Sequence, residues 1–233
     1  MTNAASEYFN RNWELYTESV NSGALFHQEM YATFGAILND HFPDQAFSIA
    51  DFGCGDLRST AKLLSAPVFK IKNLIGVDGA ADVLNLARAN TAHLACEKTF
   101  MCEDMLSACA KLPDASLDVI FSSYALHHYS LAQKEAFLQN CQRVLRPDGI
   151  FVLVDGVRAR HQTREQWIEV LESNFLAKAQ HSPKDHEQCF EHVRSSDFPE
   201  TLETFASIAQ KQAWKKFQIA LDKGHCACQV FSK

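Results

Sequence analysis

The chain has 233 residues, of which 47% are hydrophobic, with a formal net charge of −6 and a sequence pI of about 5.9. This length and apolar content suffice for one large α/β domain with a well-buried core. The acidic balance excludes a general attraction to nucleic-acid phosphates, so DNA is not expected as a partner and RNA is disfavoured.

The eight cysteines are scattered through apolar segments and include no Cys-x-x-Cys pair. We therefore interpret them as reduced, mostly buried thiols rather than as a disulfide framework. The longest apolar run, Ile150 to Val154, is too short to cross a bilayer, and the first residues lack the pattern of a signal peptide. The sequence predicts a cytoplasmic protein without a membrane partner.

The N-terminal part of the chain predicts two helices, roughly Ala5 to Glu18 and Leu25 to Phe42, which together form a helical cap over about residues 1–42. The first helix carries aromatic side chains near helical spacing, namely Tyr8, Phe9, Trp13 and Tyr16. Such stripes are more often part of a core than of a ligand site.

From Phe47 onward, short apolar strands alternate with helices, which predicts a mainly parallel sheet with helices on both faces. The expected strands are Phe47–Phe52, Leu74–Val77, Thr99–Cys102, Leu117–Ser122 and Ile150–Val154. The expected helices between them are Thr60–Leu64, Ala80–Ala92 and Leu131–Leu145. We expect the turn at residues 147–149 to stop the last of these helices, with Gly149 free to take a positive φ.

The end of the chain departs from this alternation. After helices around residues 164–177 and 199–212, two strands, about Lys215–Leu221 and His225–Phe231, are joined by a short segment that contains Gly224. This pattern predicts an antiparallel hairpin. The predicted fold class is α/β, with a seven-stranded mainly parallel sheet and a C-terminal antiparallel hairpin. Residues 1–233 are expected to form a single domain in which about 157–200 is an inserted cover.

The segment Phe47–Asp56 has the form of a nucleoside-binding turn, since an apolar strand runs into Asp51 and two glycines before a helix. Gly53 and Gly55 permit backbone angles that let the main chain approach a ligand closely at a helix N-terminus. An ordinary strand-to-helix turn has the same pattern. A nicotinamide site would need Gly-x-Gly-x-x-Gly, but residue 58 is Arg, and that fold does not end in a hairpin.

Four segments together resemble the class I, Rossmann-like S-adenosylmethionine-dependent methyltransferases: Ile49–Gly55, Val77–Asp78, Glu103–Met105 and Leu117–His128. A fifth, Arg143–Val152, is similar to the turn that enters the family's fifth strand. Their order and spacing match over about residues 47–155, and the terminal hairpin matches the family's last two strands. The resemblance implies methyl transfer from S-adenosylmethionine by in-line displacement, with S-adenosylhomocysteine as product.

The resemblance also implies which residues would hold the cofactor. On the methionine side these are Asp51, Gly53, Cys54, Gly55 and either Ser122 or Ser123. Many relatives have a third glycine where this chain has Leu57, so we expect a side-chain wall near the methionine there.

On the nucleoside side, Asp78 would accept hydrogen bonds from both ribose hydroxyls. Asp104 would bind the adenine amino group, while Met105 would offer its backbone amide and an apolar surface. Each aspartate alone has a second interpretation, because an Asp at the end of a strand is often a helix N-cap or turn residue. Their joint placement favours the cofactor site.

The candidate catalytic residues follow the fourth strand: Tyr124, His127 and His128. A histidine takes a proton near neutral pH, and an aromatic face attracts a cationic sulfonium. The alternative is that His127 caps or packs the following helix. Tyr8, Trp13 and Tyr16 are expected to roof the cofactor.

The acceptor pocket could be completed by Asp155, His186 and His192. No metal is expected, because His181, His186 and His192 do not share one helix face. We expect a small-molecule acceptor, given the acidic charge and the inserted cover. RNA or protein methylation and a non-catalytic cofactor-binding regulator are the alternatives.

Overall fold

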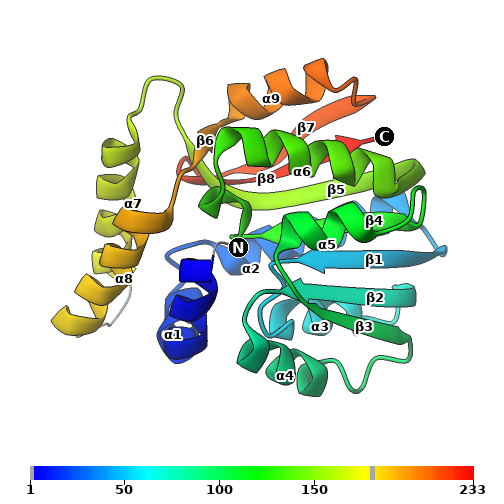
Figure 1. Ribbon diagram of the computed structural model, residues 1–233, viewed down its shortest axis with the longest axis horizontal. Helices are drawn as coiled ribbons and strands as arrows, with labels where there is room; N and C mark the ends of the chain where they lie inside the picture. Colours follow the sequence, from blue (N-terminus) through cyan, green and yellow to red (C-terminus); the bar gives the residue numbers. More distant parts are fainter. Residues whose placement is uncertain (1–2, 179–181) are drawn as a thin grey trace.

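The computed structural model describes residues 3–178 and 182–233 and shows a central sheet between two layers of helices (Figure 1). The strand order is β3-β2-β1-β4-β5-β8-β7, with the first five strands parallel and β8 antiparallel to both β5 and β7. The strands are β1 (Ala46–Phe52), β2 (Lys70–Asp78), β3 (Glu97–Cys102), β4 (Leu117–Ser123), β5 (Leu145–Arg158), β6 (Glu200–Thr201), β7 (Lys216–Asp222) and β8 (Cys226–Ser232). The predicted α/β class with its closing antiparallel hairpin is confirmed.

The described sheet has eight strands instead of seven, because the two-residue strand β6 pairs in parallel with the end of β5 at Val157 and Arg158. A strand of this length leaves no periodic pattern in the sequence. Within the described ranges, no helix is both long and apolar enough to span a membrane.

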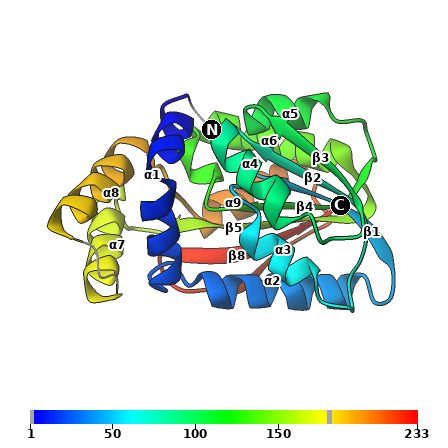
Figure 2. The ribbon, with the colours of Figure 1, turned by 90° about the horizontal axis from the view of Figure 1, so that it is seen from below.

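The two faces of the sheet are covered by different helices (Figure 2). The helices are α1 (Asn3–Asn21), α2 (His27–His41), α3 (Arg58–Leu64), α4 (Ala81–Asn90), α5 (Met105–Lys111), α6 (Leu131–Val144), α7 (Arg164–Lys178), α8 (Pro183–Ser196) and α9 (Leu202–Lys211), with a 3₁₀ turn at Leu126–His128. Apolar residues of α2, α3 and α4 form one buried cluster with the sheet, and those of α5, α6 and α9 form the other.

Strand β5 shows why the sheet is buried on both faces. Ile150 and Val152 belong to the cluster under α2, whereas Phe151 and Leu153 belong to the cluster under α6. All four side chains are fully buried. A continuous apolar run is what a parallel strand covered on both faces requires.

Strand β5 begins earlier than predicted, because Leu145 already pairs with Leu117 of β4. Gly149 does not take the positive φ expected for it, and Asp148 does, with φ 61°. A Cβ on Gly149 would lie 3.0 Å from the carbonyl oxygens of Arg146 and Asp118, so this glycine serves close packing.

Helix α1 runs along the carboxyl ends of the strands and lies beside α8 (Figures 1 and 2). It is kinked at Asn12, whose Nδ2 donates to the Tyr8 carbonyl at 3.0 Å. The Asn12 Oδ1 accepts from Nε2 of Gln188 in α8 at 2.6 Å, and the ring of Tyr8 stacks on His192 at 3.9 Å between centroids. The N-terminal and inserted helices are thus joined beyond the edge of the sheet.

Candidate active site

Two cavities meet at the carboxyl ends of β1, β2 and β4. The first, which we call the cofactor cleft, lies between the turn after β1, the ends of β2 and β4, and helices α1 and α2. Its described lining is Phe9, Trp13, Tyr16, Thr17, Val20, Asn21, His27, Tyr31, Gly53–Ser59, Asp78 and Ser123–Ala125. The glycine turn therefore lies at a cavity, and its contact with the cofactor stays a prediction.

The glycines are needed for packing within the protein as well as for a ligand. Gly53 and Gly55 have positive φ values of 71° and 53°. A Cβ on Gly53 would lie 2.3 Å from the Cβ of Ala125, and one on Gly55 would lie 2.5 Å from the Trp13 indole. The Trp13 Nε1 also donates to Asp56 at 3.3 Å, so α1 closes directly onto this turn.

Leu57 occupies the place of the third glycine in a glycine-like conformation, with φ 54°. It lines the cleft, but its side chain is buried and packs under β2, with Cδ1 3.0 Å from the position of a Cβ on Gly76. The expected side-chain wall is therefore directed mainly into the core.

Two buried carboxylates lie at the ends of β1 and β2, of which Asp78 lines the cleft and Asp51 is not among the described lining residues. Asp51 accepts from Thr60 Oγ1 at 2.7 Å, while its second oxygen has no partner among the described residues. Burial raises the pKa of Asp51 to about 7, although the Thr60 hydrogen bond opposes this shift. Asp78 accepts from the amides of Gly55 and Ala80, both at 2.9 Å, and lines the cleft. Burial also raises its pKa, against the effect of these amides.

Asp104 and Met105 have a different environment. Asp104 is the N-cap of α5, and its side chain accepts from the amides of Leu106 and Ser107 and from the Tyr129 hydroxyl. Met105 is buried in the core under α6. Neither is among the described residues that line the cleft, so their contact with adenine stays a prediction.

Of the two serines at the end of β4, Ser123 lies at the cleft, where its Oγ is 3.0 Å from the Tyr31 hydroxyl. Ser122 is fully buried behind it and donates to the Phe52 carbonyl at 2.8 Å. The structure thus favours Ser123 over Ser122 as a lining residue.

The second cavity, which we call the acceptor cavity, lies between α1, α7, α8 and the end of β5, and measures about 690 Å³ including its opening. Most of its lining surface is apolar. The described lining residues, polar ones included, are Tyr8, Phe9, Leu15, Tyr16, Ser19, Leu25, Tyr124, His127, His128, Gly156, Trp167, Leu171, Phe175, Cys189, His192, Val193, Asp197, His225 and Cys226. Phe9, Tyr16 and Tyr124 line both cavities.

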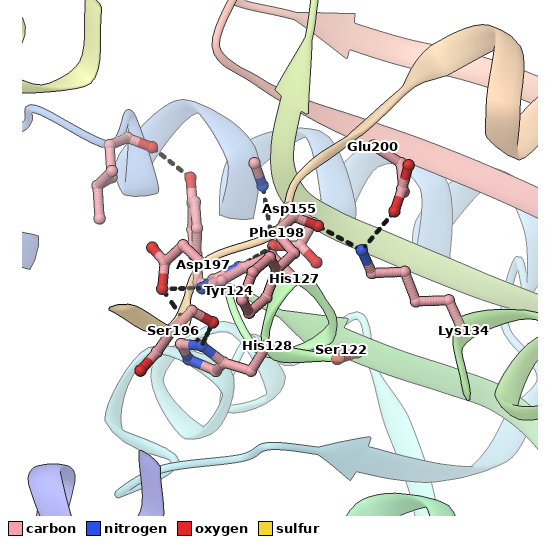
Figure 3. A network of polar contacts seen from close by, with 12 residues as sticks. Ser122, Tyr124, His127, His128, Lys134, Asp155, Ser196, Asp197, Phe198 and Glu200 are labelled. Carbon is pink, nitrogen blue, oxygen red and sulfur yellow. Dashed lines mark hydrogen bonds and ion pairs between the residues drawn. The ribbon is translucent and has the colours of Figure 1, made fainter. Parts of the chain in front are cut away.

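A group of histidines and aspartates forms the polar part of the acceptor cavity (Figure 3). His127 Nδ1 lies 2.5 Å from Asp155 Oδ1, and its Nε2 lies 3.6 Å from Asp197 Oδ1. Burial alone would lower the pKa of His127, but the charges of Asp155 and Asp197 outweigh burial and raise this pKa to about 9. His128 Nδ1 lies 3.3 Å from the same oxygen of Asp197 and 3.1 Å from the Ser196 carbonyl.

The segment after α8 is held over these histidines by main-chain and lysine contacts. The Phe198 amide donates to the His127 carbonyl at 2.8 Å. The buried Lys134 of α6 donates to the Phe198 carbonyl and to Glu200, the latter at 2.9 Å (Figure 3). These contacts bring Asp197 to the site.

Tyr124 separates the two cavities in an unusual backbone conformation, with φ 51°. Its hydroxyl donates to the Leu25 carbonyl, and burial raises its pKa well above the ordinary value. The structure therefore presents Tyr124 as an aromatic wall and disfavours it as a base.

Of the remaining residues predicted for the acceptor pocket, some join the polar group of the cavity and others lie elsewhere. Asp155 and His192 join the polar group, and burial lowers the pKa of His192 to about 4. His186 instead lies 3.9 Å from Glu172 and does not line the cavity among the described residues. His181 lies outside the described residues. Asp197 was missed, because it follows a helix 70 residues beyond His127 and has no motif of its own.

A family model described as "Methyltransferase domain" matches residues 49–149. An uncharacterized methyltransferase of Anoxybacillus flavithermus is 26% identical over 179 residues, which cover 75% of this chain and 80% of the relative. A second, from Oceanobacillus iheyensis, is 22% identical over 185 residues, covering 78% and 81% of the two chains.

Solved structures extend the likeness to nearly the whole chain. The plantazolicin methyltransferase BpumL in complex with SAH has a TM-score of 0.67 and 14% identity, covering 98% of this chain and 95% of that one. A SAM-dependent methyltransferase of Leishmania major has a TM-score of 0.62 and 16% identity, covering 98% and 81%. At these identities the structural likeness shows a shared fold.

Proposed function

Because the chain is a class I S-adenosylmethionine-dependent methyltransferase, we propose that its methyl acceptor is a small molecule bound in the acceptor cavity. The main support for this proposal is that the mainly apolar acceptor cavity adjoins the cofactor cleft and shares three aromatic residues with it. Its composition is that of small-molecule sites, which are concave, mostly apolar and equipped with a few polar groups.

The residues in and around the cofactor cleft offer the chemistry that S-adenosylmethionine requires, although Asp51, Asp104 and Met105 are not among its described lining residues. Asp78 would bind the ribose hydroxyls, and the unpaired oxygen of Asp51 is suited to the methionine ammonium. Ser123 and the backbone of the glycine turn would line the methionine, and Asp104 and Met105 would hold the adenine. When bound, the cofactor supplies an electrophilic methyl group on a cationic sulfonium, next to which Tyr16 offers an aromatic face.

The acceptor would lie with its apolar body between α1, α7 and α8 and its nucleophilic group toward the shared aromatic wall. In-line displacement depends on alignment, which the walls of two adjoining cavities provide without covalent catalysis. A neighbour of similar fold, the plantazolicin methyltransferase BpumL, is described in complex with a monoazolic desmethylPZN analog and SAH, and a small-molecule acceptor is compatible with that likeness.

His127 is the proposed catalytic residue when the acceptor group must lose a proton; because its pKa is raised to about 9, it would act through the neutral form, which becomes more abundant as the pH rises toward 9. Asp155 holds its Nδ1, which leaves Nε2 directed to the polar part of the cavity. His128 is proposed to bind the acceptor beside it. These roles combine a positioned proton acceptor with a carboxylate that fixes its orientation.

The test is a screen of cell extract fractions for a mass gain of one methyl group that depends on S-adenosylmethionine. We expect a metabolite fraction to gain it with the wild type and not with Asp78→Ala, which should weaken S-adenosylhomocysteine binding by about 1.5–3 kcal/mol in calorimetry. Gain confined to RNA or protein fractions would contradict the small-molecule acceptor. Tight cofactor binding without methyl transfer to any fraction would favour the alternative that the protein is a non-catalytic cofactor-binding regulator.

A further inference from the structure

His127, His128 and Asp197 converge at one point of the acceptor cavity. Each offers a ligand atom, and these atoms lie within 4.8 Å of one another. All three residues are more than nine-tenths buried, with exposures of 8%, 4% and 6%. Asp197 Oδ1 and His128 Nε2 make no hydrogen bond with the described residues. Among the described residues, Asp197 Oδ1 has only ion-pair contacts with the two histidines, at 3.3 and 3.6 Å, and a buried carboxylate oxygen without a full hydrogen bond indicates a ligand.

The two donor-atom separations that involve Asp197 fit a small divalent cation, and all three donor atoms lie within 4.8 Å of one another. Tetrahedral zinc with bonds of about 2.0–2.1 Å places neighbouring donor atoms roughly 3.4 Å apart. Asp197 Oδ1 lies 3.6 Å from Nε2 of His127 and 3.3 Å from Nδ1 of His128. We propose that these three residues bind a divalent transition-metal ion, with zinc as the best fit to two imidazoles and one carboxylate.

The surroundings of His127 match those of a metal-binding histidine. Asp155 is 1% exposed and contacts the Nδ1 of His127, which leaves Nε2 as the free ligand atom. Metal-bound histidines commonly donate their other ring N–H to a carboxylate in this way, which fixes the ring and raises its basicity. The Gly156 amide donates to the same carboxylate oxygen at 2.8 Å and holds it in place.

His128, the next residue in the sequence, has two ring nitrogens to consider as ligand atoms. His128 Nδ1 also lies 3.1 Å from the Ser196 carbonyl, so ligation through this nitrogen would move the ring proton to Nε2. That nitrogen has no hydrogen-bond partner in the described part of the chain. A divalent ion would also offset the charges of two buried carboxylates, Asp155 and Asp197.

Three protein ligands leave a fourth position, which is the arrangement of catalytic zinc sites. Since the ligands line the acceptor cavity, this position would receive an oxygen, nitrogen or sulfur atom of the acceptor. This part of the inference rests on the proposed function. With Nε2 on the ion, His127 would act as a ligand in place of the proton acceptor proposed above, so the acceptor's X–H proton would pass to solvent, and the bound X atom would form its bond to the methyl carbon as the sulfur–methyl bond breaks.

The alternative is an ion cluster that only fastens the segment after α8 to His127. Metal titration of the whole protein separates the two. After treatment with a chelator, Co²⁺ and Zn²⁺ are added separately, and we expect one equivalent of each to bind. Bound Co²⁺ should give the intense visible d–d absorption of a four-coordinate nitrogen and oxygen site.

Variants locate the bound ion. Asp197→Asn and His128→Gln should each abolish the one-to-one binding, and Asp155→Asn should weaken Zn²⁺ binding about 10–100-fold. The exposed His161, changed to Gln, is the matched control and should leave binding unchanged. Calorimetry with S-adenosylhomocysteine should give wild-type affinity in every variant, which shows that each is folded and keeps its cofactor cleft.

Several results would overturn the proposal. One is a wild-type protein that binds S-adenosylhomocysteine but no stoichiometric Co²⁺ or Zn²⁺. Another is metal binding that survives in Asp197→Asn and His128→Gln. A third is near-ultraviolet thiolate-to-cobalt charge transfer, which would place the ion on cysteines instead. Failure of cofactor binding in the wild type would count against the proposed function and not against the metal site.

Discussion

At the scale of single residues, Asp51 links pH to cofactor binding. Burial raises its pKa to about 7, and only the ionised carboxylate attracts the methionine ammonium. We expect the affinity for S-adenosylhomocysteine to fall up to about tenfold per unit as the pH decreases below 7. Calorimetry from pH 6 to 8 checks this. Asp51→Asn should bind more weakly and lose this dependence; a parallel pH dependence in the variant would remove Asp51 from the ammonium contact.

The same carboxyl group has the opposite effect on the stability of the ligand-free protein. Its folded pKa lies above its unfolded value of about 3.9, so the folded state binds more protons between these two values. The Asp51 contribution to stability therefore decreases as the pH rises from about 4 to about 7, by at most about 1.4 kcal/mol per unit. It is constant above that range. Asp51→Asn should remove this contribution, which urea unfolding at several pH values measures.

Residues in a local motif could be predicted from the sequence, and residues brought together by the fold could not. Asp78 follows a strand and lies at the cleft as expected. Asp104 also follows a strand, but its carboxylate caps α5, which is the second interpretation of the same pattern. Asp197 meets His127 only because Lys134 and the Phe198 amide fasten the segment after α8. No sequence spacing predicts the contact between Asp197 and His127.

At the scale of elements, α1 closes the cofactor cleft through Trp13. Its indole lies against Gly55 and donates to Asp56, while Tyr16 on the same helix lines both cavities. We expect Trp13→Ala to weaken S-adenosylhomocysteine binding at least about tenfold, because an aromatic wall of the cleft is lost. Glu14→Ala, at an exposed neighbouring position, is the matched control. Equal affinities in the two variants would exclude a role for α1 in the cofactor site.

The elements that the sequence predicted well are those with a long periodic pattern. The five strands of residues 47–155 and helices α3, α4 and α6 were predicted in order, since each buries a face whose period is visible, whereas the seven-residue helix α5 was not predicted. Helix α8 was missed, although Ser182 caps it through the Asp185 amide, because its residues are mostly polar. The contact of Gln188 with Asn12, which joins α8 to α1, depends on this missed helix.

At the scale of the whole molecule, α1 lines both cavities, and we expect it to couple them. This helix contacts the turn after β1 through Trp13, and it contacts α8 through Asn12 and through Tyr8, which stacks on His192. Because binding protects the segments that it orders, S-adenosylhomocysteine should slow amide hydrogen exchange in α1 and, through these contacts, in α8. Hydrogen-exchange mass spectrometry of the wild type, with and without ligand, measures this.

A variant that removes the contact between Asn12 and Gln188, compared with the wild type, tests whether the coupling passes through this contact. Gln188→Ala removes its side-chain donor while leaving the cofactor cleft intact, since Gln188 does not line it in the described structure. In this variant, the ligand should still protect α1 and the turn after β1, but the protection of α8 should decrease. Undiminished protection of α8 would mean that the coupling does not pass through this contact. Protection confined to the turn after β1 in the wild type would mean that the two cavities are ordered independently.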